Sequence, residues 1–193
     1  MEILGKLLGS QARIKIMRLF LLNKDQSFTT KEVEKRSRVK TALIRSELKL
    51  LSAVNFIKKK TAGYSFNPAF KYIKEFEGLL ISADTLNEQA IADSFKKVGR
   101  VKLLVVSGVF IKNKDSRVDL LIVGDKLNKS KIEEGVRRLE AEIGAEMVYG
   151  IFETKEFVYR LNMYDKLIRD IMDFPHKVIL ESKELSTLSL KKR

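Results

Sequence analysis

The spacing of apolar residues in the first third of the chain predicts three amphipathic helices. The first is expected within residues 10–23, with Ser10 as its N-cap, because apolar residues recur there every three or four positions. A second helix is expected directly after Thr30, whose hydroxyl is suited to an N-cap. A third is expected within residues 39–54.

This third helix has a broad apolar side and a small, polar and basic side. The expected apolar side consists of Leu43, Ile44, Leu48, Leu50, Leu51 and Val54. The opposite side consists of Lys40, Thr41, Ala42, Arg45, Ser46 and Lys49. Short side chains let a helix approach the floor of a DNA groove, arginine can bond guanine edges, and lysines can meet phosphates. The pattern therefore predicts a helix that reads the DNA major groove.

A basic β-hairpin is predicted after the three helices. Residues 56–60 and 64–67 read as its two strands, and they turn around Gly63. Three successive lysines, Lys58, Lys59 and Lys60, line the first strand.

Three helices followed by a basic hairpin resemble a winged helix-turn-helix, and residues 10–67 are similar to the arsenic-repressor-like group of bacterial and archaeal regulators. The resemblance implies that the third helix enters the major groove and that the hairpin touches the adjacent backbone. The implied DNA-binding residues are Lys40, Thr41, Ala42, Arg45 and Ser46, with Lys49 on the same face, and Lys58, Lys59, Lys60 and Tyr64 on the wing. A winged helix used for protein contact remains the alternative.

A helical connector is expected over residues 68–99. Its two periodic segments suggest one helix starting at Pro68, another capped by Asp84, and a stop at Gly99. We expect a homodimer, since two half-sites are the usual way a small reader gains affinity. A monomer whose apolar stripes cover its own second domain remains open.

The second half of the chain alternates between strand and helix patterns. Strands are expected at 101–110, 116–124, 145–154 and 177–182, with helices at 129–144, 155–161 and 165–173. We therefore expect an α+β protein of three parts: a winged helix (1–67), the connector (68–99) and an α/β domain on a small mixed sheet (100–193).

Composition limits the chemistry that this chain can carry. Among its 193 residues there is no Cys, which excludes disulfides and thiolate ligands, and a single His176, which excludes a His-cluster metal site. The longest apolar runs are too short to span a membrane, and the N-terminus lacks the features of a signal peptide. We expect a cytoplasmic protein that does not contact a membrane.

The positive charge is concentrated in the predicted winged helix. Residues 1–67 contain 15 Lys and Arg against 5 Asp and Glu, a net of +10, whereas residues 68–193 contain 23 against 20, a net of +3. A basic surface gains free energy by releasing counterions from phosphates, so double-stranded DNA is the expected partner. A solvated basic face without a partner is the alternative on charge alone.

The order of elements in residues 101–182 resembles the minimal nucleotidyltransferase domain of the polymerase-beta superfamily. In active members, a Gly-Ser pair ends the first strand and helps to hold the triphosphate. Two carboxylates at alternate positions of the next strand, joined by a third from a later strand, bind two divalent cations. Those ions align the attacking hydroxyl and stabilise the leaving pyrophosphate.

This chain departs from that pattern at each position. Gly108 is retained but Val109 replaces the hydroxyl, and Arg117 stands where the first carboxylate is expected, leaving Asp119 alone. Glu146 is the only acid near the third position. We expect no catalytic residues and no resident cofactor or metal, with Mg²⁺ relevant only to an active transferase. Arg117 is expected to pair with Asp119 or to contact a phosphate.

The sequence thus favours a DNA-binding transcriptional regulator with a non-catalytic nucleotidyltransferase-like domain. That domain could retain a nucleotide as ligand or serve a structural role. Two alternatives stay open: an active Mg²⁺-dependent nucleotidyltransferase targeted by its winged helix, and a protein-interaction module. Residues 190–193 are expected to form a basic tail.

Overall fold

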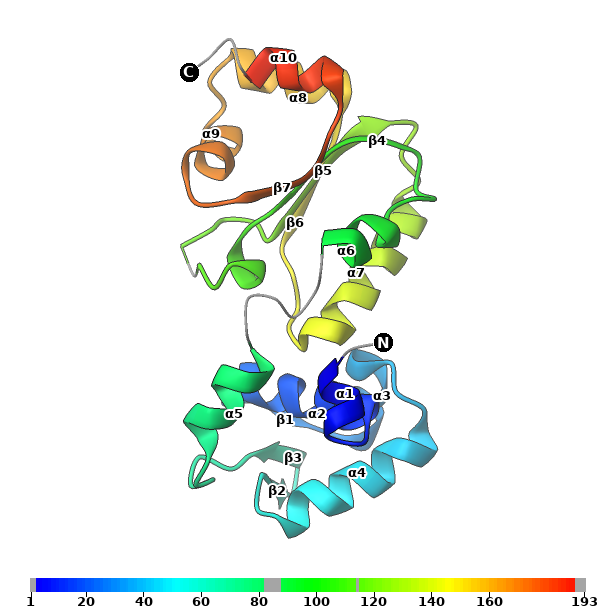
Figure 1. Cartoon of the computed structure of the whole chain (residues 1–193), viewed down its shortest axis with the longest axis vertical. Helices are drawn as coiled ribbons and strands as arrows, with labels where there is room; N and C mark the ends of the chain where they lie inside the picture. Colours follow the sequence, from blue (N-terminus) through cyan, green and yellow to red (C-terminus); the bar gives the residue numbers. More distant parts are fainter. Residues whose placement is uncertain (1–2, 82–87, 114, 190–193) are drawn as a thin grey trace. The chain divides into compact units, whose positions relative to one another are not determined.

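The computed structural model describes residues 3–81, 88–113 and 115–189, and it confirms an α+β fold (Figure 1). The chain forms two compact units. The first comprises Met1–Thr85 and Arg137–Glu146, and the second comprises Leu86–Val136 and Met147–Arg193. The segment expected as a connector is therefore shared between the units, and the helix α7 (Lys129–Ile143) contributes residues to both.

The first unit contains the expected order of three helices and a hairpin. Its elements before residue 82 are α1 (Ile3–Leu7), α2 (Gln11–Leu22), β1 (Ser27–Phe28), α3 (Thr30–Ser37), α4 (Thr41–Ala53), β2 (Ile57–Lys60), β3 (Gly63–Phe66) and α5 (Ile73–Leu80). The sequence did not predict α1 or β1. The two residues of β1 pair antiparallel with β3, which gives a three-stranded sheet in the order β1-β3-β2.

The core of the first unit is built around α2 and a group of phenylalanines. Both Ile14 and Phe20 of α2 are fully buried. Edge-to-face contacts join Phe56 to Phe70 and Phe66, with ring centroids 5.1 and 5.4 Å apart. This packing ties the start of the wing to the segment that leads into α5.

The predicted N-cap residue is confirmed at α2 and wrong at α3. Ser10 caps α2 as expected, since its hydroxyl accepts a hydrogen bond from the backbone N–H of Arg13 at 3.1 Å. The cap of α3 is Thr29 rather than Thr30. Thr29 and Glu32 form a reciprocal capping box, in which Glu32 accepts the Thr29 backbone N–H at 2.7 Å. These hydrogen bonds hold the pKa of Glu32 below its usual value.

Two predicted helix boundaries in the connector were wrong. Pro68 lies in a turn, because the side chain of Asn67 accepts the backbone N–H of Ala69 at 3.1 Å, and α5 starts only at Ile73. Gly99 is not a helix stop, since α6 (Glu88–Ser94) ends earlier and Gly99 lies in the turn before the next strand. Asp84 lies outside the described residues.

The second unit is organised on a four-stranded mixed sheet. Besides α6 and α7, its elements are β4 (Arg100–Val106), a short 3-10 helix (Gly108–Phe110), β5 (Leu120–Asp125), β6 (Tyr149–Glu153), α8 (Thr154–Asn162), α9 (Lys166–Asp173), β7 (Lys177–Glu181) and α10 (Lys183–Ser189). The strand order is β6-β5-β4-β7, in which β5 and β6 are parallel and the other pairs antiparallel. Strands β4, β5 and β6 are shorter than predicted, and α10 was not predicted.

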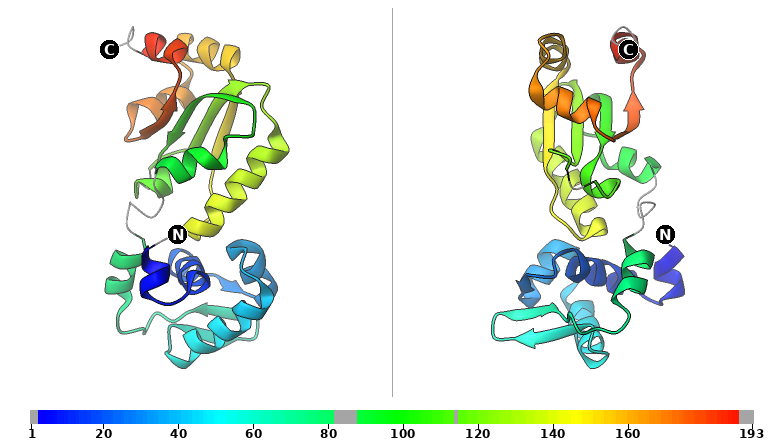
Figure 2. Two further views of the ribbon diagram at one scale, coloured as in Figure 1. Left: turned by 45° about the vertical axis from the view of Figure 1, so that its right-hand side comes forward. Right: turned by 90° about the vertical axis from the view of Figure 1, so that its left-hand side faces the viewer.

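Helices lie on both sides of this sheet. On one face, Leu103, Leu121 and Val123 pack against Phe157 of α8 and Ile168 of α9. The helix α6 lies on the other side of the sheet (Figure 2). Among the helices that the structure describes, none is long and apolar enough to cross a membrane.

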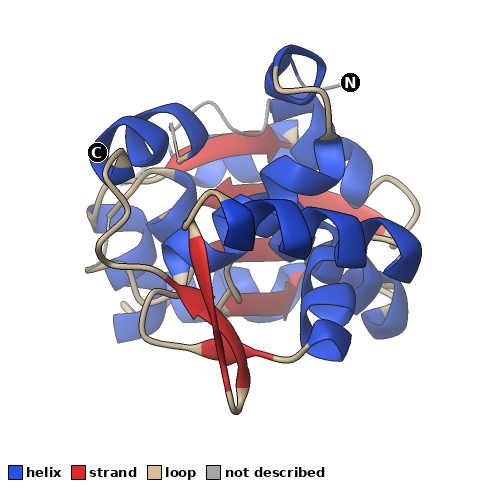
Figure 3. Cartoon of the chain, turned by 90° about the horizontal axis from the view of Figure 1, so that it is seen from below, coloured by secondary structure: helices blue, strands red, loops and turns tan. Residues whose placement is uncertain are grey.

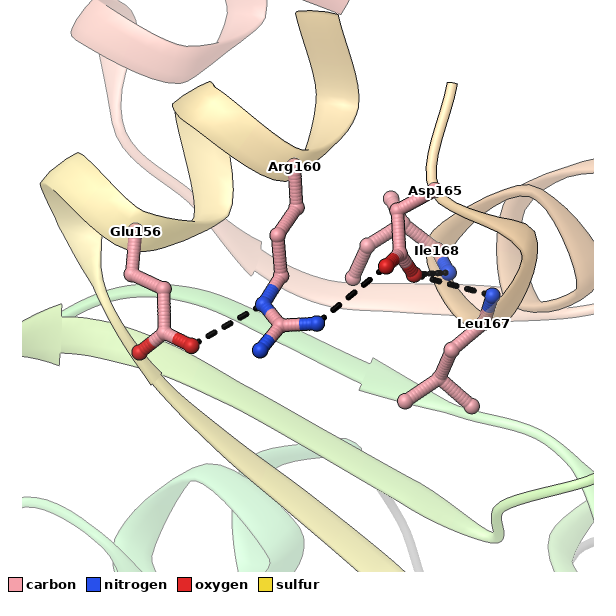
Figure 4. Close-up of polar contacts among 5 residues, drawn as sticks. All are labelled: Glu156, Arg160, Asp165, Leu167 and Ile168. Carbon is pink, nitrogen blue, oxygen red and sulfur yellow. Dashed lines mark hydrogen bonds and ion pairs between the residues drawn. The ribbon is translucent and has the colours of Figure 1, made fainter. Parts of the chain in front are cut away.

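Asp165 joins α8 to α9 through a set of polar contacts (Figure 4). Its carboxylate caps α9 by accepting the backbone N–H groups of Leu167 at 2.9 Å and Ile168 at 3.3 Å. Arg160 of α8 donates to the same carboxylate at 3.1 Å and to Glu156 at 2.9 Å. The pKa of Asp165 is lowered, chiefly by the hydrogen bond from Ile168 and also by those from Leu167 and by Arg160.

Replacement of Asp165 by alanine is expected to lower the Tm by about 2–4 °C near pH 7, the usual effect of losing an N-cap in a chain of this length. The folded-state pKa of this carboxyl is depressed, so its stabilisation is present above its unfolded pKa, about 3.9. It is lost as the pH falls through the folded-state value. Thermal melts of both proteins should therefore converge as the pH is lowered below the folded-state pKa. An equal difference at every pH would show that the charge of Asp165 contributes nothing.

A guanidinium is buried inside the first unit. Arg18 is 1% exposed, and its Nε donates to the carbonyl of Leu80 at 2.7 Å while Nη1 donates to the carbonyl of Glu142 at 3.2 Å. Asn23 acts similarly at the end of α2, where its amide donates to the carbonyl of Gly144 at 2.8 Å. Residues 137–146 are thus fixed to α2 by side chains that bond their backbone.

Arg18→Leu is expected to destabilise the protein by about 2–4 kcal/mol, because a buried and a partly buried carbonyl group lose their donors. Urea unfolding followed by circular dichroism measures the loss. The exposed Arg100 offers a matched control, and Arg100→Leu should change stability by less than about 0.5 kcal/mol. Similar small effects for both variants would contradict a structural role for the Arg18 hydrogen bonds.

Candidate nucleic-acid interface

The solvent face of α4 carries most of the residues predicted to read DNA. Lys40, Ala42, Arg45, Ser46 and Lys49 are all exposed, and Thr41 is half-buried. On the inner side, Ile44, Leu48 and Leu51 enter the core as predicted.

The expected apolar side of α4 was too broad. Leu43, Leu50 and Val54 are 51%, 39% and 54% exposed, so they belong to the solvent face instead. The core reaches only a narrow strip of the helix, and Glu47 occupies part of that strip. Apolar character alone therefore overestimated the buried arc.

Glu47 anchors α4 to the helices behind it. It is 7% exposed and accepts a hydrogen bond from Nε of Arg13 at 2.8 Å. The same guanidinium donates through Nη1 to the carbonyl of Leu8 at 2.9 Å. The sequence interpretation missed this pair. A charged residue between Ile44 and Leu51, on the buried side of a helix, was the signal that could have indicated it.

Two hydroxyl groups of the predicted face form hydrogen bonds within the unit. Thr41 Oγ1 donates to Glu34 at 2.5 Å and thereby fixes the turn between α3 and α4. Ser46 Oγ donates to the carbonyl of Leu43 at 2.8 Å. Thr41 thus has a positioning role, while Ala42 and Ser46 keep the centre of the exposed face small.

The wing is the antiparallel pair β2–β3, in which Lys59 lies opposite Tyr64. The lysines of β2 are exposed, whereas Tyr64 is half-buried against the core of the unit. Gly63 is required at the turn: its φ is +127°, and a Cβ there would lie 2.3 Å from the carbonyl oxygen of Phe28. Figures 1 and 3 show the hairpin and α4 on the same side of the first unit.

The cations of α4 and the wing form what we call the basic surface. It consists of Lys40, Arg45, Lys49, Lys58, Lys59 and Lys60. Within the described residues, no acidic side chain pairs with any of the six.

Four other cations of the first unit are paired with carboxylates. Arg13 pairs with Glu47 at 2.8 Å, Lys15 pairs with Glu142 at 2.6 Å, and Lys24 pairs with Glu77. A further pair joins Arg36 to Glu146 at 2.7 Å. Lys31 and Lys74 are also exposed without a carboxylate partner among the described residues, so the basic surface is set apart by the gathering of six unpaired cations on α4 and the wing.

In the second unit, Asp119 is used as a structural clamp. The side chain is 8% exposed, and its two oxygens accept the backbone N–H groups of Val109 and Val148, each at 2.8 Å. It thereby joins the segments that follow β4, precede β5 and precede β6. Gly108 makes room for it, because a Cβ at that position would lie 2.0 Å from Asp119 Oδ1.

The expected ion pair between Arg117 and Asp119 was wrong. Arg117 pairs instead with Asp170 of α9. The strand begins only at Leu120, so positions 117 and 119 do not share one face of a regular strand. Once the amides of Val109 and Val148 bind Asp119, Arg117 pairs with an acid that is distant in the sequence.

Of the four residues predicted as a degenerate nucleotide site, Gly108, Val109, Arg117 and Asp119, the structure brings three together, and Arg117 pairs with Asp170 instead. Gly108, Val109 and Asp119 are joined by the clamp, whereas Glu146 lies in the first unit and pairs with Arg36. The part of the chain that the structure describes holds no group of three His, Cys, Asp or Glu that could bind a metal ion. The geometry favours a structural use of the remaining carboxylate.

Comparison with known proteins finds no protein similar to this chain. No family model matches the chain, and neither the curated proteins nor the solved structures contain a match.

Asp119→Asn is expected to destabilise the second unit by about 1–3 kcal/mol, because an amide NH₂ would face a backbone N–H that now has an acceptor. Millimolar Mg²⁺ should leave the Tm of both proteins unchanged. A metal ligand would behave in the opposite way: the wild type would gain stability on adding Mg²⁺ and the variant would not. Thermal melts with and without Mg²⁺ distinguish the two roles.

Proposed function

We propose that this protein is a DNA-binding transcriptional regulator that reads duplex DNA through α4 and the β2–β3 wing. The observation that carries the proposal is the basic surface, whose six exposed cations have no carboxylate partner among the described residues. Leaving these charges unpaired has a clear benefit if phosphates neutralise them, because binding then releases condensed counterions.

The shape of α4 supports duplex DNA rather than an unstructured polyanion. At the middle of its exposed face lie Ala42 and Ser46, which let the helix backbone come close to base edges. Arg45 is long enough to reach guanine from there. The lysines of the wing would contact the backbone beside the groove, as winged-helix proteins do.

A homodimer is part of the proposal. A DNA-binding protein with one recognition helix contacts few base pairs. Two copies related by a two-fold axis would double that contact on a palindromic site. Sedimentation equilibrium of the free protein tests this point separately from DNA binding.

The second unit is proposed to act without catalysis, in a cytoplasmic regulator. Support comes from Asp119, whose two oxygens both accept backbone N–H groups, and from Arg117, whose cation stands where an active transferase needs a carboxylate. Equilibrium dialysis with labelled ATP tests nucleotide binding by this unit separately from DNA binding.

Binding of a labelled random-sequence duplex is expected to weaken steeply with salt, by about 10³-fold between 50 and 200 mM if the basic surface meets five or six phosphates. The triple variant Lys58→Ala, Lys59→Ala, Lys60→Ala should bind more weakly at low salt. It should also reduce the slope of log K against log salt by about three. Fluorescence anisotropy over a salt series measures both quantities.

A control with the same change in net charge is available on the second unit. Lys129, Lys131 and Lys155 are exposed lysines, and replacing all three by alanine should leave the slope nearly unchanged. Equal effects of the two triple variants would mean that overall charge, rather than the basic surface, drives binding. No binding of duplex by the wild type at 50 mM salt would contradict the proposed function.

A further inference from the structure

The exposed face of α4 contains a row of large apolar side chains. Leu43, Leu50 and Val54 stand at spacings of seven and four residues, which places them within about 40° of one another around the helix axis. The core is already closed by Ile44 and Leu51, so burial in the unit does not explain the row. Neighbouring exposed apolar side chains on one face indicate a contact surface.

This apolar row lies beside small residues and opposite a basic edge. With 100° per residue, Ala42 and Ser46 fall in the middle of the exposed arc, Lys49 lies about 20° from Ala42, and Arg45 falls on the far side. One face of α4 therefore offers a strip of apolar surface, a strip that permits close approach, and a strip of positive charge.

The charge around the row favours DNA over a protein as its partner. Protein interfaces are depleted in lysine, whereas this face carries Lys49 and lies on the same side of the unit as the wing lysines (Figure 3). The major groove of DNA presents one apolar group that such a row can contact, the 5-methyl group of thymine. Double-stranded RNA lacks that methyl group, and its deep major groove does not admit a helix.

We propose that Leu43 and Leu50 contact thymine 5-methyl groups in the major groove, so that the protein selects sites with thymine at the positions they face. This inference rests on the proposed function and adds a base preference to the proposed DNA binding. Arg45 and the lysines would bind guanine edges and phosphates, while the leucines would distinguish thymine from cytosine, which has no methyl group there.

The test uses a duplex that the wild-type protein selects from a random pool, compared with the same duplex carrying dU in place of every dT. Wild type is expected to bind the dU duplex about three- to tenfold more weakly, from the loss of one or two buried methyl contacts. In the double variant Leu43→Ala, Leu50→Ala, the ratio of the two affinities should fall to within about twofold of one. Both positions are exposed and alanine favours helix, so the fold should persist.

Lys49→Ala is the matched control on the same helix. It should weaken binding to the dT and dU duplexes by the same factor, because it removes a phosphate contact and no methyl contact.

Three results would overturn the inference. The wild type could bind both duplexes equally while still preferring the selected sequence over random DNA, which leaves the proposed function intact. The leucine variant could keep the full difference between dT and dU. Alternatively, the variant could lose self-association with an unchanged dT-to-dU ratio, which would assign the row to a second copy of the chain. Failure to bind any duplex would instead remove the proposed function itself.

Discussion

The first unit depends on the burial of one guanidinium. Arg18 is the most deeply enclosed charged residue of α2, and its hydrogen bonds reach the carbonyl of Leu80 at the end of α5 and that of Glu142 in the later segment. Carbonyl groups at helix ends lack partners within their own helices, and leaving them buried without donors is costly. Arg18 supplies donors to two such segments at once. Its presence explains why a basic residue stands in the middle of an apolar helix.

The same principle separates the two kinds of cation in this unit. Arg13, Lys15 and Arg36 are bound to carboxylates and hold elements together. The cations of the basic surface have no such partners, and their mutual repulsion is a standing cost that an anionic ligand would remove. The proposed function is therefore inferred from cations that no carboxylate neutralises. The helix that carries these cations is in turn held from behind by the pair Arg13–Glu47, which orients its exposed face.

Much of the fold could be predicted because helical periodicity is local. The spacing of apolar residues located α2, α4, α8 and α9, and the lysine-rich strand with its glycine turn located the wing. The two-residue strand β1 was missed because it is too short to show any period, and only its pairing with β3 makes it a strand. The extent of the apolar side of α4 was overestimated because the burial of a side chain depends on the segments that pack against it. Those segments are distant in the sequence.

The candidate sites show the same limit. Residue types alone indicated the basic face, and they put Arg117 where the nucleotidyltransferase pattern would have a carboxylate. They could not show that Asp119 bonds two backbone amides, since Val148 comes from a segment far along the chain. Nor could they identify Asp170 as the partner of Arg117. The sequence shows which side chains are charged, but only the folded chain shows which partner neutralises each of them.

The discontinuity of the first unit has a consequence for its synthesis. Arg18 bonds the carbonyl of Glu142 and Asn23 bonds that of Gly144, so a ribosome must release residues 86–136 of the second unit before the first can close its interior. Until then the guanidinium of Arg18 can bond the carbonyl of Leu80 but not that of Glu142. A fragment that stops near residue 85 would lack these hydrogen bonds, so no single cut in the chain separates the first unit from the second.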